Sequence, residues 1–134
     1  MKKLKTGFTL IELLVVISII AILSAIGMTA FTNAQKKARD ARRIGDMKTY
    51  QATYEQYYST TGGNSYAVCG TMNADFSGAA PADPKNSTPY TYASTCAAAS
   101  YCACAKLESQ KGNASNGTCT FAVGGGYFCV KNLQ

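Results

Sequence analysis

An apolar run from Phe8 to Phe31 constrains this chain more than any other feature of its sequence. Its one charged residue is Glu12, and its other polar side chains are hydroxyls. A helix rises about 1.5 Å per residue, so this run would be about 36 Å long. That length exceeds the roughly 30 Å hydrocarbon core of a bilayer. We therefore expect a membrane-spanning helix near the N-terminus.

Glu12 is the unusual residue of this segment. A carboxylate in an apolar environment is costly, and it must find a partner or be neutralised. In one interpretation Glu12 lies near the membrane surface and reaches water. In the other a cation lies close by. Cleavage of the chain after Gly7 would create such a cation, the new α-amine of Phe8, on the same subunit or on a neighbour.

The helical pattern continues beyond the apolar run. No proline lies between Phe8 and Ser59, which predicts one continuous helix of about 50 residues and about 75 Å. The part from Ile44 to Tyr57 must bury its apolar stripe against the second half of the chain. The full set of residues at steps of three and four is Ala34, Ala38, Ala41, Ile44, Met47, Tyr50, Tyr54 and Tyr57.

Charged residues cluster on this helix between Lys36 and Asp46. Asp40 and Asp46 have basic residues within reach at helical spacing, and such pairs usually form a solvated face. The alternative is that these charges contact neighbouring subunits or anionic lipid headgroups.

Six cysteines lie in the second half of the chain, and an even number after a membrane segment indicates disulfides in an oxidising compartment. A metal site is the weaker alternative, because the chain has no histidine and one close cysteine pair, Cys102 and Cys104. On a strand these two side chains would face the same side, so we expect them to bond to different partners. The disulfide candidates are Cys69, Cys96, Cys102, Cys104, Cys119 and Cys129.

The sequence of the second half of the chain indicates an α+β fold, in which a small antiparallel sheet packs on the long helix. Residues 65–88 have a loop composition, and Asp75 and Asp83 within them offer weak support for a structural calcium ion. Short segments rich in Tyr, Thr, Val, Phe and Cys predict three or four strands: Tyr90–Thr95, Tyr101–Leu107, Thr118–Val123 and Tyr127–Lys131. The predicted domains are a leader (1–7), a transmembrane helix (8–31), its amphipathic continuation (32–60) and a disulfide-stapled head (61–134).

The sequence Gly7-Phe8-Thr9-Leu10-Ile11-Glu12, with Lys5-Thr6 before it and the apolar run after it, resembles the class III signal of type IV prepilins and pseudopilins. The resemblance covers the first third of the chain. It implies a pilin-like fold, cleavage between Gly7 and Phe8 by a prepilin peptidase, and N-methylation of Phe8. It also implies that Glu12 recognises the N-terminus of a neighbouring subunit. Many pilins have a proline late in the apolar segment, whereas this chain has Gly27-Met28-Thr29 there.

A cleavable secretory signal, cut near Ala25 to Gly27, is the competing interpretation of the N-terminus. The length of the run, Glu12 within it and the continuing helical pattern all argue against this interpretation.

The sequence contains no catalytic constellation, so we expect no enzymatic activity and no cofactor. The expected function is a structural subunit of a type IV pilus, a homo-oligomeric surface filament for adhesion, twitching motility or DNA uptake. Its partners would be the peptidase, membrane lipid and the assembly machinery. The precursor would span the cytoplasmic membrane with its N-terminus in the cytoplasm, and the filament would be extracellular or periplasmic.

Two alternatives remain. One is a major pseudopilin of a type II secretion system. The other is a monomeric, membrane-anchored module whose basic, tyrosine-rich head binds single-stranded nucleic acid by stacking and phosphate contacts.

Overall fold

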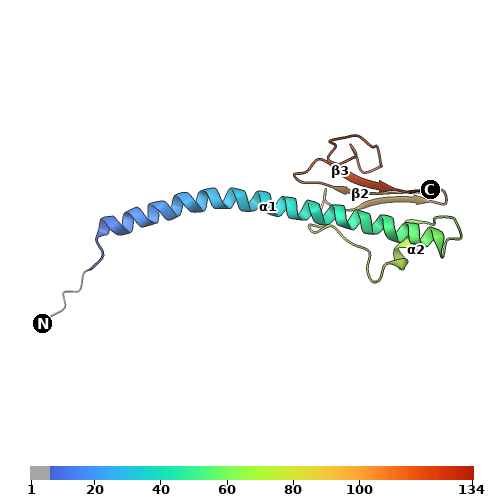
Figure 1. Ribbon diagram of the computed structural model, residues 1–134, viewed down its shortest axis with the longest axis horizontal. Coiled ribbons are helices and arrows are strands. Elements are labelled where there is room, and N and C mark those ends of the chain that lie inside the picture. The colour runs from blue at the N-terminus through green and yellow to red at the C-terminus, as the bar shows by residue number, and fades with distance from the viewer. Residues whose placement is uncertain (1–6) are drawn as a thin grey trace. The chain divides into compact units, whose positions relative to one another are not determined.

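The computed structural model describes residues 7–134, so the leader residues 1–6 lie outside it. The chain has the predicted α+β fold (Figure 1). It forms two compact units, one ending at Gln35 and the other comprising Lys36 to Gln134. The elements are helix α1 (Leu10–Ser59), short helix α2 (Cys69–Met72), the 3-10 turn η1 (Asn73–Asp75), and strands β1 (Ala93–Ala97), β2 (Ser100–Lys106) and β3 (Tyr127–Lys131).

The three strands form one antiparallel sheet in the order β1-β2-β3. Successive side chains of a strand point to opposite faces, which gives the sheet two different surfaces. On β2 the residues Tyr101, Ala103 and Ala105 join the main core. Cys104 lies in a second cluster, with Cys129 directly opposite it on β3. The sheet therefore packs on α1 with one face and on the loop between β2 and β3 with the other.

The main core joins this sheet to the part of α1 that belongs to the second unit, which runs alongside the sheet (Figure 1). Tyr54 of α1 is fully buried, and its ring lies edge-to-face with Tyr101 of β2 at 5.0 Å between centroids. The predicted stripe is confirmed from its middle to its C-terminal end by the buried helix residues Met47, Tyr50, Tyr54 and Tyr57.

The buried face of α1 also extends beyond the predicted part, toward the N-terminus. Ala34, Ala38 and Ala41, which share the helical spacing, are exposed there, and the buried residues are two charged ones, Asp40 and Arg43. Both side chains are completely inaccessible to solvent, so the prediction of a solvated charged face fails for this pair. It fails because Arg43 has partners from outside the helix.

The Arg43 guanidinium lies at the centre of a buried ionic cluster. Its Nε and Nη2 donate to both oxygens of Asp83, at 2.6 and 2.9 Å. Its Nη1 donates to Asp40 at 2.9 Å and to Glu108 at 2.7 Å. Arg39 and Lys85 also contact Glu108, which completes a set of three cations and three carboxylates. Buried charges are tolerated only when paired in this way.

Asp40 fixes the turn that follows β2. Its carboxylate accepts hydrogen bonds from the backbone N–H groups of Glu108, Ser109 and Gln110 at 2.8–3.0 Å. Burial alone would raise the pKa of Asp40, but these bonds and the one from Arg43 outweigh it and lower the pKa. This turn and the Asp83 loop are therefore both attached to one turn of α1.

The predicted strand Thr118–Val123 is wrong. These residues form a loop, with one isolated bridge from Phe121 to Ala114. Cys119 has a φ of +54°, which a strand does not allow. The side-chain oxygen of Asn116 accepts from the backbone N–H groups of Thr118 and Thr120, which folds the segment into a turn.

Two smaller differences concern the segments before β2. The first strand begins at Ala93 rather than Tyr90, which instead forms an isolated bridge with Ser87. The region predicted to be loop contains α2 and η1.

All six cysteines form disulfides, as Cys69–Cys96, Cys102–Cys119 and Cys104–Cys129. The expectation that Cys102 and Cys104 bond to different partners is confirmed. Each disulfide joins residues that lie after α1 in the chain, so none attaches the helix to the rest of the second unit. That attachment rests on the core and on the ionic cluster.

The cluster predicts very different effects for two adjacent arginines. Arg43→Ala should lower the free energy of unfolding by roughly 3–5 kcal/mol, because it leaves buried carboxylates without their cation. Arg42→Ala is the matched control, since its side chain is 66% exposed and its contact to Asp46 is 3.9 Å long. Denaturant titration of the oxidised, detergent-solubilised chain, followed by near-UV circular dichroism, measures both. Equal effects for the two variants would contradict the role given to Arg43.

The cluster also predicts sensitivity to acid. The hydrogen bond from Arg39 is the main reason why the pKa of Glu108 lies well below its usual value. Burial would raise the pKa of Asp83, but the bond from Arg43 lowers it. Carboxyl groups with a depressed folded pKa stabilise the fold above their ordinary pKa of about 4, and this stability is lost as the pH falls further.

We therefore expect the free energy of unfolding to be constant from about pH 7 to about pH 5 and to fall below about pH 4. In Arg43→Ala the destabilisation relative to wild type should shrink as the carboxyl groups become protonated. Denaturant titrations at a series of pH values test this. Parallel pH curves for the two proteins would contradict it.

Candidate assembly site at the N-terminal end of the helix

The predicted cleavage site lies just before α1. Gly7, Phe8 and Thr9 precede the first helical residue, Leu10, and all are exposed. Phe8 is 87% exposed. Within the described residues, the bond between Gly7 and Phe8 therefore lies on accessible, non-helical backbone.

Glu12 is held by Thr9 at the start of α1. The Thr9 backbone N–H and hydroxyl both donate to Oε2 of Glu12, at 2.9 and 2.7 Å. The Glu12 backbone N–H points back to the Thr9 hydroxyl at 3.3 Å. This reciprocal arrangement is a capping box, which satisfies backbone donors at the helix start. It also fixes the direction of the carboxylate one turn from Phe8.

The side chains that follow Glu12 form a continuous apolar surface. The large hydrophobic residues between Phe8 and Phe31 are all roughly half or more exposed. α1 includes a window long and apolar enough to cross a membrane, and none of this window is buried within the chain. The hydroxyls of Ser18 and Thr29 donate to backbone oxygens of the same helix, so they do not interrupt this surface.

The remaining predicted sites lie in the second unit. Of the two calcium candidates, Asp75 is exposed, and both oxygens of Asp83 are bonded to Arg43. Five of the nine tyrosines are buried, which removes most of the proposed stacking surface for nucleic acid. The buried tyrosines are Tyr50, Tyr54, Tyr57, Tyr66 and Tyr101.

These tyrosines have structural partners. The hydroxyls of Tyr66 and Tyr101 donate to the carboxylate of Glu55 at 2.9–3.0 Å. Burial, followed by this bond to Glu55, raises the pKa of Tyr101. Burial also raises the pKa of Tyr54 to about 12. These hydroxyls are therefore neutral, internal groups.

α1 is a single helix with a capped, apolar N-terminal part and a C-terminal part that packs on a small antiparallel sheet. This is the α+β arrangement of type IV pilin-like proteins. Residues 2–28 match the prokaryotic N-terminal methylation motif. The recognition of a prepilin-type N-terminus is thereby confirmed.

A relative of this chain is the prepilin peptidase-dependent protein D of Escherichia coli (strain K12), with 51% identity over 49 residues. The match covers 37% of this chain and 34% of the relative, so it spans about a third of that protein's length. No solved structure matches the chain significantly.

Thr9 is the residue of this site that the sequence analysis missed. The pattern of a threonine followed three residues later by a glutamate, just before an apolar run, is the sequence signature of a capping box. It shows that Glu12 has a local structural role in addition to any role between subunits.

The capping box predicts a local effect of Thr9→Val. The variant loses the hydroxyl that bonds Glu12, and a lost cap costs about 1 kcal/mol, or about fivefold in local opening. Amide hydrogen exchange by NMR in detergent micelles should show faster exchange at Glu12, whose N–H loses its acceptor, and at residue 9. Ser18→Ala is the matched control. It removes a hydroxyl that donates to the backbone oxygen of Leu14, and it should leave the exchange of these two amides unchanged. Unchanged exchange in Thr9→Val would refute the box.

Proposed function

We propose that this protein is a type IV pilus subunit. It is made as a membrane-spanning precursor, cut between Gly7 and Phe8 by a prepilin peptidase, methylated on the new N-terminus and polymerised through its apolar helix. The single observation that carries the proposal is an apolar helix surface that is wholly exposed in the chain and contains one charge, Glu12.

Processing is supported by the methylation motif and by the peptidase dependence stated in the relative's name. The exposed position of the Gly7–Phe8 bond is compatible with cleavage in the membrane surface region. Cleavage places a cationic α-amine on Phe8, four residues from the Glu12 carboxylate.

The proposed assembly satisfies two physical requirements of the apolar segment. Its side chains must be covered by lipid or by other apolar helices. The Glu12 carboxylate requires a cation once it leaves water. A bundle of these helices, in which Glu12 of one subunit meets the methylated N-terminus of its neighbour, meets both demands. The ionic cluster and the disulfides would then keep each head folded on the filament surface.

A pseudopilin of a type II secretion system is the second candidate. The helix run from Lys37 to Arg43 is similar to that of major pseudopilins, but in this chain Arg39, Asp40 and Arg43 are engaged within the head. We favour the surface pilus, since a disulfide-stapled head suits an exposed filament.

The test separates the charge of Glu12 from its capping role. Glu12→Gln retains an acceptor for Thr9 but removes the charge, whereas Glu12→Ala removes both. We expect both variants to be processed but absent from sedimentable filaments sheared from cells, because neither can pair with the N-terminus. Ser18→Ala should assemble like wild type.

Filament formation by Glu12→Gln at the wild-type level would reduce Glu12 to a capping residue. Normal assembly of both variants would contradict the proposal. Processed wild-type protein confined to the membrane fraction would favour the pseudopilin.

A further inference from the structure

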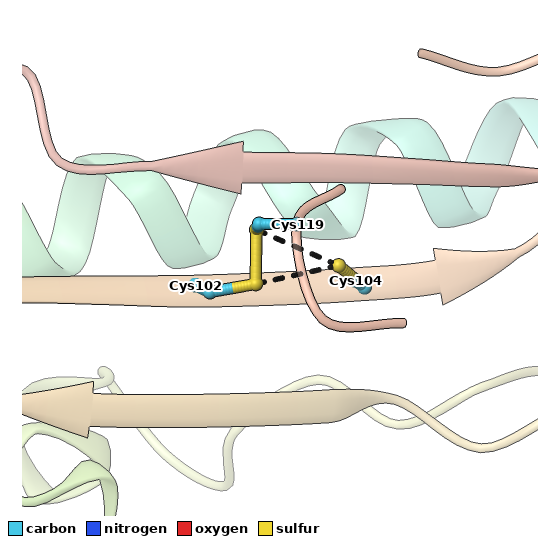
Figure 2. A group of neighbouring side chains, drawn as sticks. All are labelled: Cys102, Cys104 and Cys119. Atoms are coloured by element: carbon cyan, nitrogen blue, oxygen red, sulfur yellow. Dashed lines mark hydrogen bonds between the residues drawn. A yellow bond between two sulfur atoms is a disulfide. The ribbon is translucent and has the colours of Figure 1, made fainter. Parts of the chain in front are cut away.

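Four of the six cysteines converge on the face of the sheet that lies away from α1. Cys102 and Cys104 come from β2, Cys129 lies opposite Cys104 on β3, and Cys119 comes from the loop between these strands. Figure 2 shows Cys104 beside the Cys102–Cys119 disulfide. Cys69 and Cys96 form a separate pair between α2 and β1.

The sulfurs of different disulfides are in van der Waals contact. Cys104 Sγ is 3.5 Å from Cys102 Sγ and 3.7 Å from Cys119 Sγ. In a tetrahedral zinc site, with zinc–sulfur bonds of about 2.3 Å, neighbouring sulfurs lie about 3.8 Å apart. The non-bonded distances of this cluster are therefore already close to the edge of a thiolate tetrahedron. The fourth sulfur, Cys129 Sγ, is bonded to Cys104.

The surroundings suit a metal ion with four thiolates. Cys104 and Cys129 are buried, whereas Cys102 and Cys119 are half-buried and line a groove of about 510 Å³. The groove offers an entry path for an ion. Lys131 lines the same groove and places a cation beside a site that would carry net negative charge. Soft thiolate ligands without histidine favour zinc-type ions over calcium or magnesium.

We propose that the reduced head binds one thiophilic divalent cation such as Zn²⁺. Its ligands are the Sγ atoms of Cys102, Cys104, Cys119 and Cys129. Sheet register holds three of these ligands in place, and the loop brings the fourth. The ion would hold the loop on the sheet in chains whose disulfides have not formed. Oxidation of the four thiolates to two disulfides passes four electrons to a thiol–disulfide oxidase and releases the ion.

The test uses the full chain in detergent, reduced by a trialkylphosphine. Each disulfide gains two electrons from the phosphine and two protons from water, and the oxygen of that water ends in the phosphine oxide. The probe is Co²⁺, which gives intense sulfur-to-metal and tetrahedral ligand-field absorption at a tetrathiolate site. We expect one Co²⁺ per chain, displacement by Zn²⁺, proton release on binding, and no binding by the oxidised chain.

The matched controls are two double variants. The Cys69→Ser/Cys96→Ser variant retains the four ligands and should bind like wild type, whereas the Cys102→Ser/Cys104→Ser variant should lose stoichiometric binding. Because the second variant could lose binding by failing to fold, alkylation of the reduced wild-type chain gives an independent measure. Zn²⁺ should slow alkylation at the four ligands, mapped by mass spectrometry, and leave Cys69 and Cys96 reactive.

Equal protection of all six cysteines, binding that depends on Cys69 or Cys96, or no tetrahedral Co²⁺ spectrum would overturn the site.

Discussion

The buried guanidinium of Arg43 is the interaction on which the second unit depends. It bonds three carboxylates from three segments, and each of these groups would be costly to bury alone. The chain therefore adopts the arrangement in which α1, the Asp83 loop and the turn at Glu108 meet. No disulfide duplicates this attachment, since all three lie beyond α1.

The two parts of α1 satisfy opposite physical demands. Its C-terminal part buries a stripe of Met47 and tyrosines against the sheet of its own chain. Its N-terminal part exposes nearly all of its apolar side chains and carries Glu12 at its capped end. The exposed apolar part of the helix must be covered by lipid or by other subunits, because the chain itself does not cover it. This requirement is the structural basis of the proposed function.

The sequence predicts those features that depend on local period. The long helix, three of the four suggested strands and the shared face of Cys102 and Cys104 all follow from spacing and composition. The burial of Arg43 could not be predicted, because charges at helical spacing are usually solvated and its partners lie 40 and 65 residues away. The strand expected around Cys119 fails because an Asn116 turn and a left-handed φ interrupt it. The Thr9–Glu12 capping box, in contrast, could have been predicted from the spacing of these two residues before the apolar run.

The most direct test of the central claim, a processed pilin-like subunit, is the intact mass and N-terminal sequence of protein sheared from the cell surface. The expected chain begins at N-methylated Phe8 and lacks the six hydrogens lost in three disulfides. An N-terminus between Ala25 and Gly27, or an uncut Met1, would contradict it and would leave a secreted or anchored binding domain.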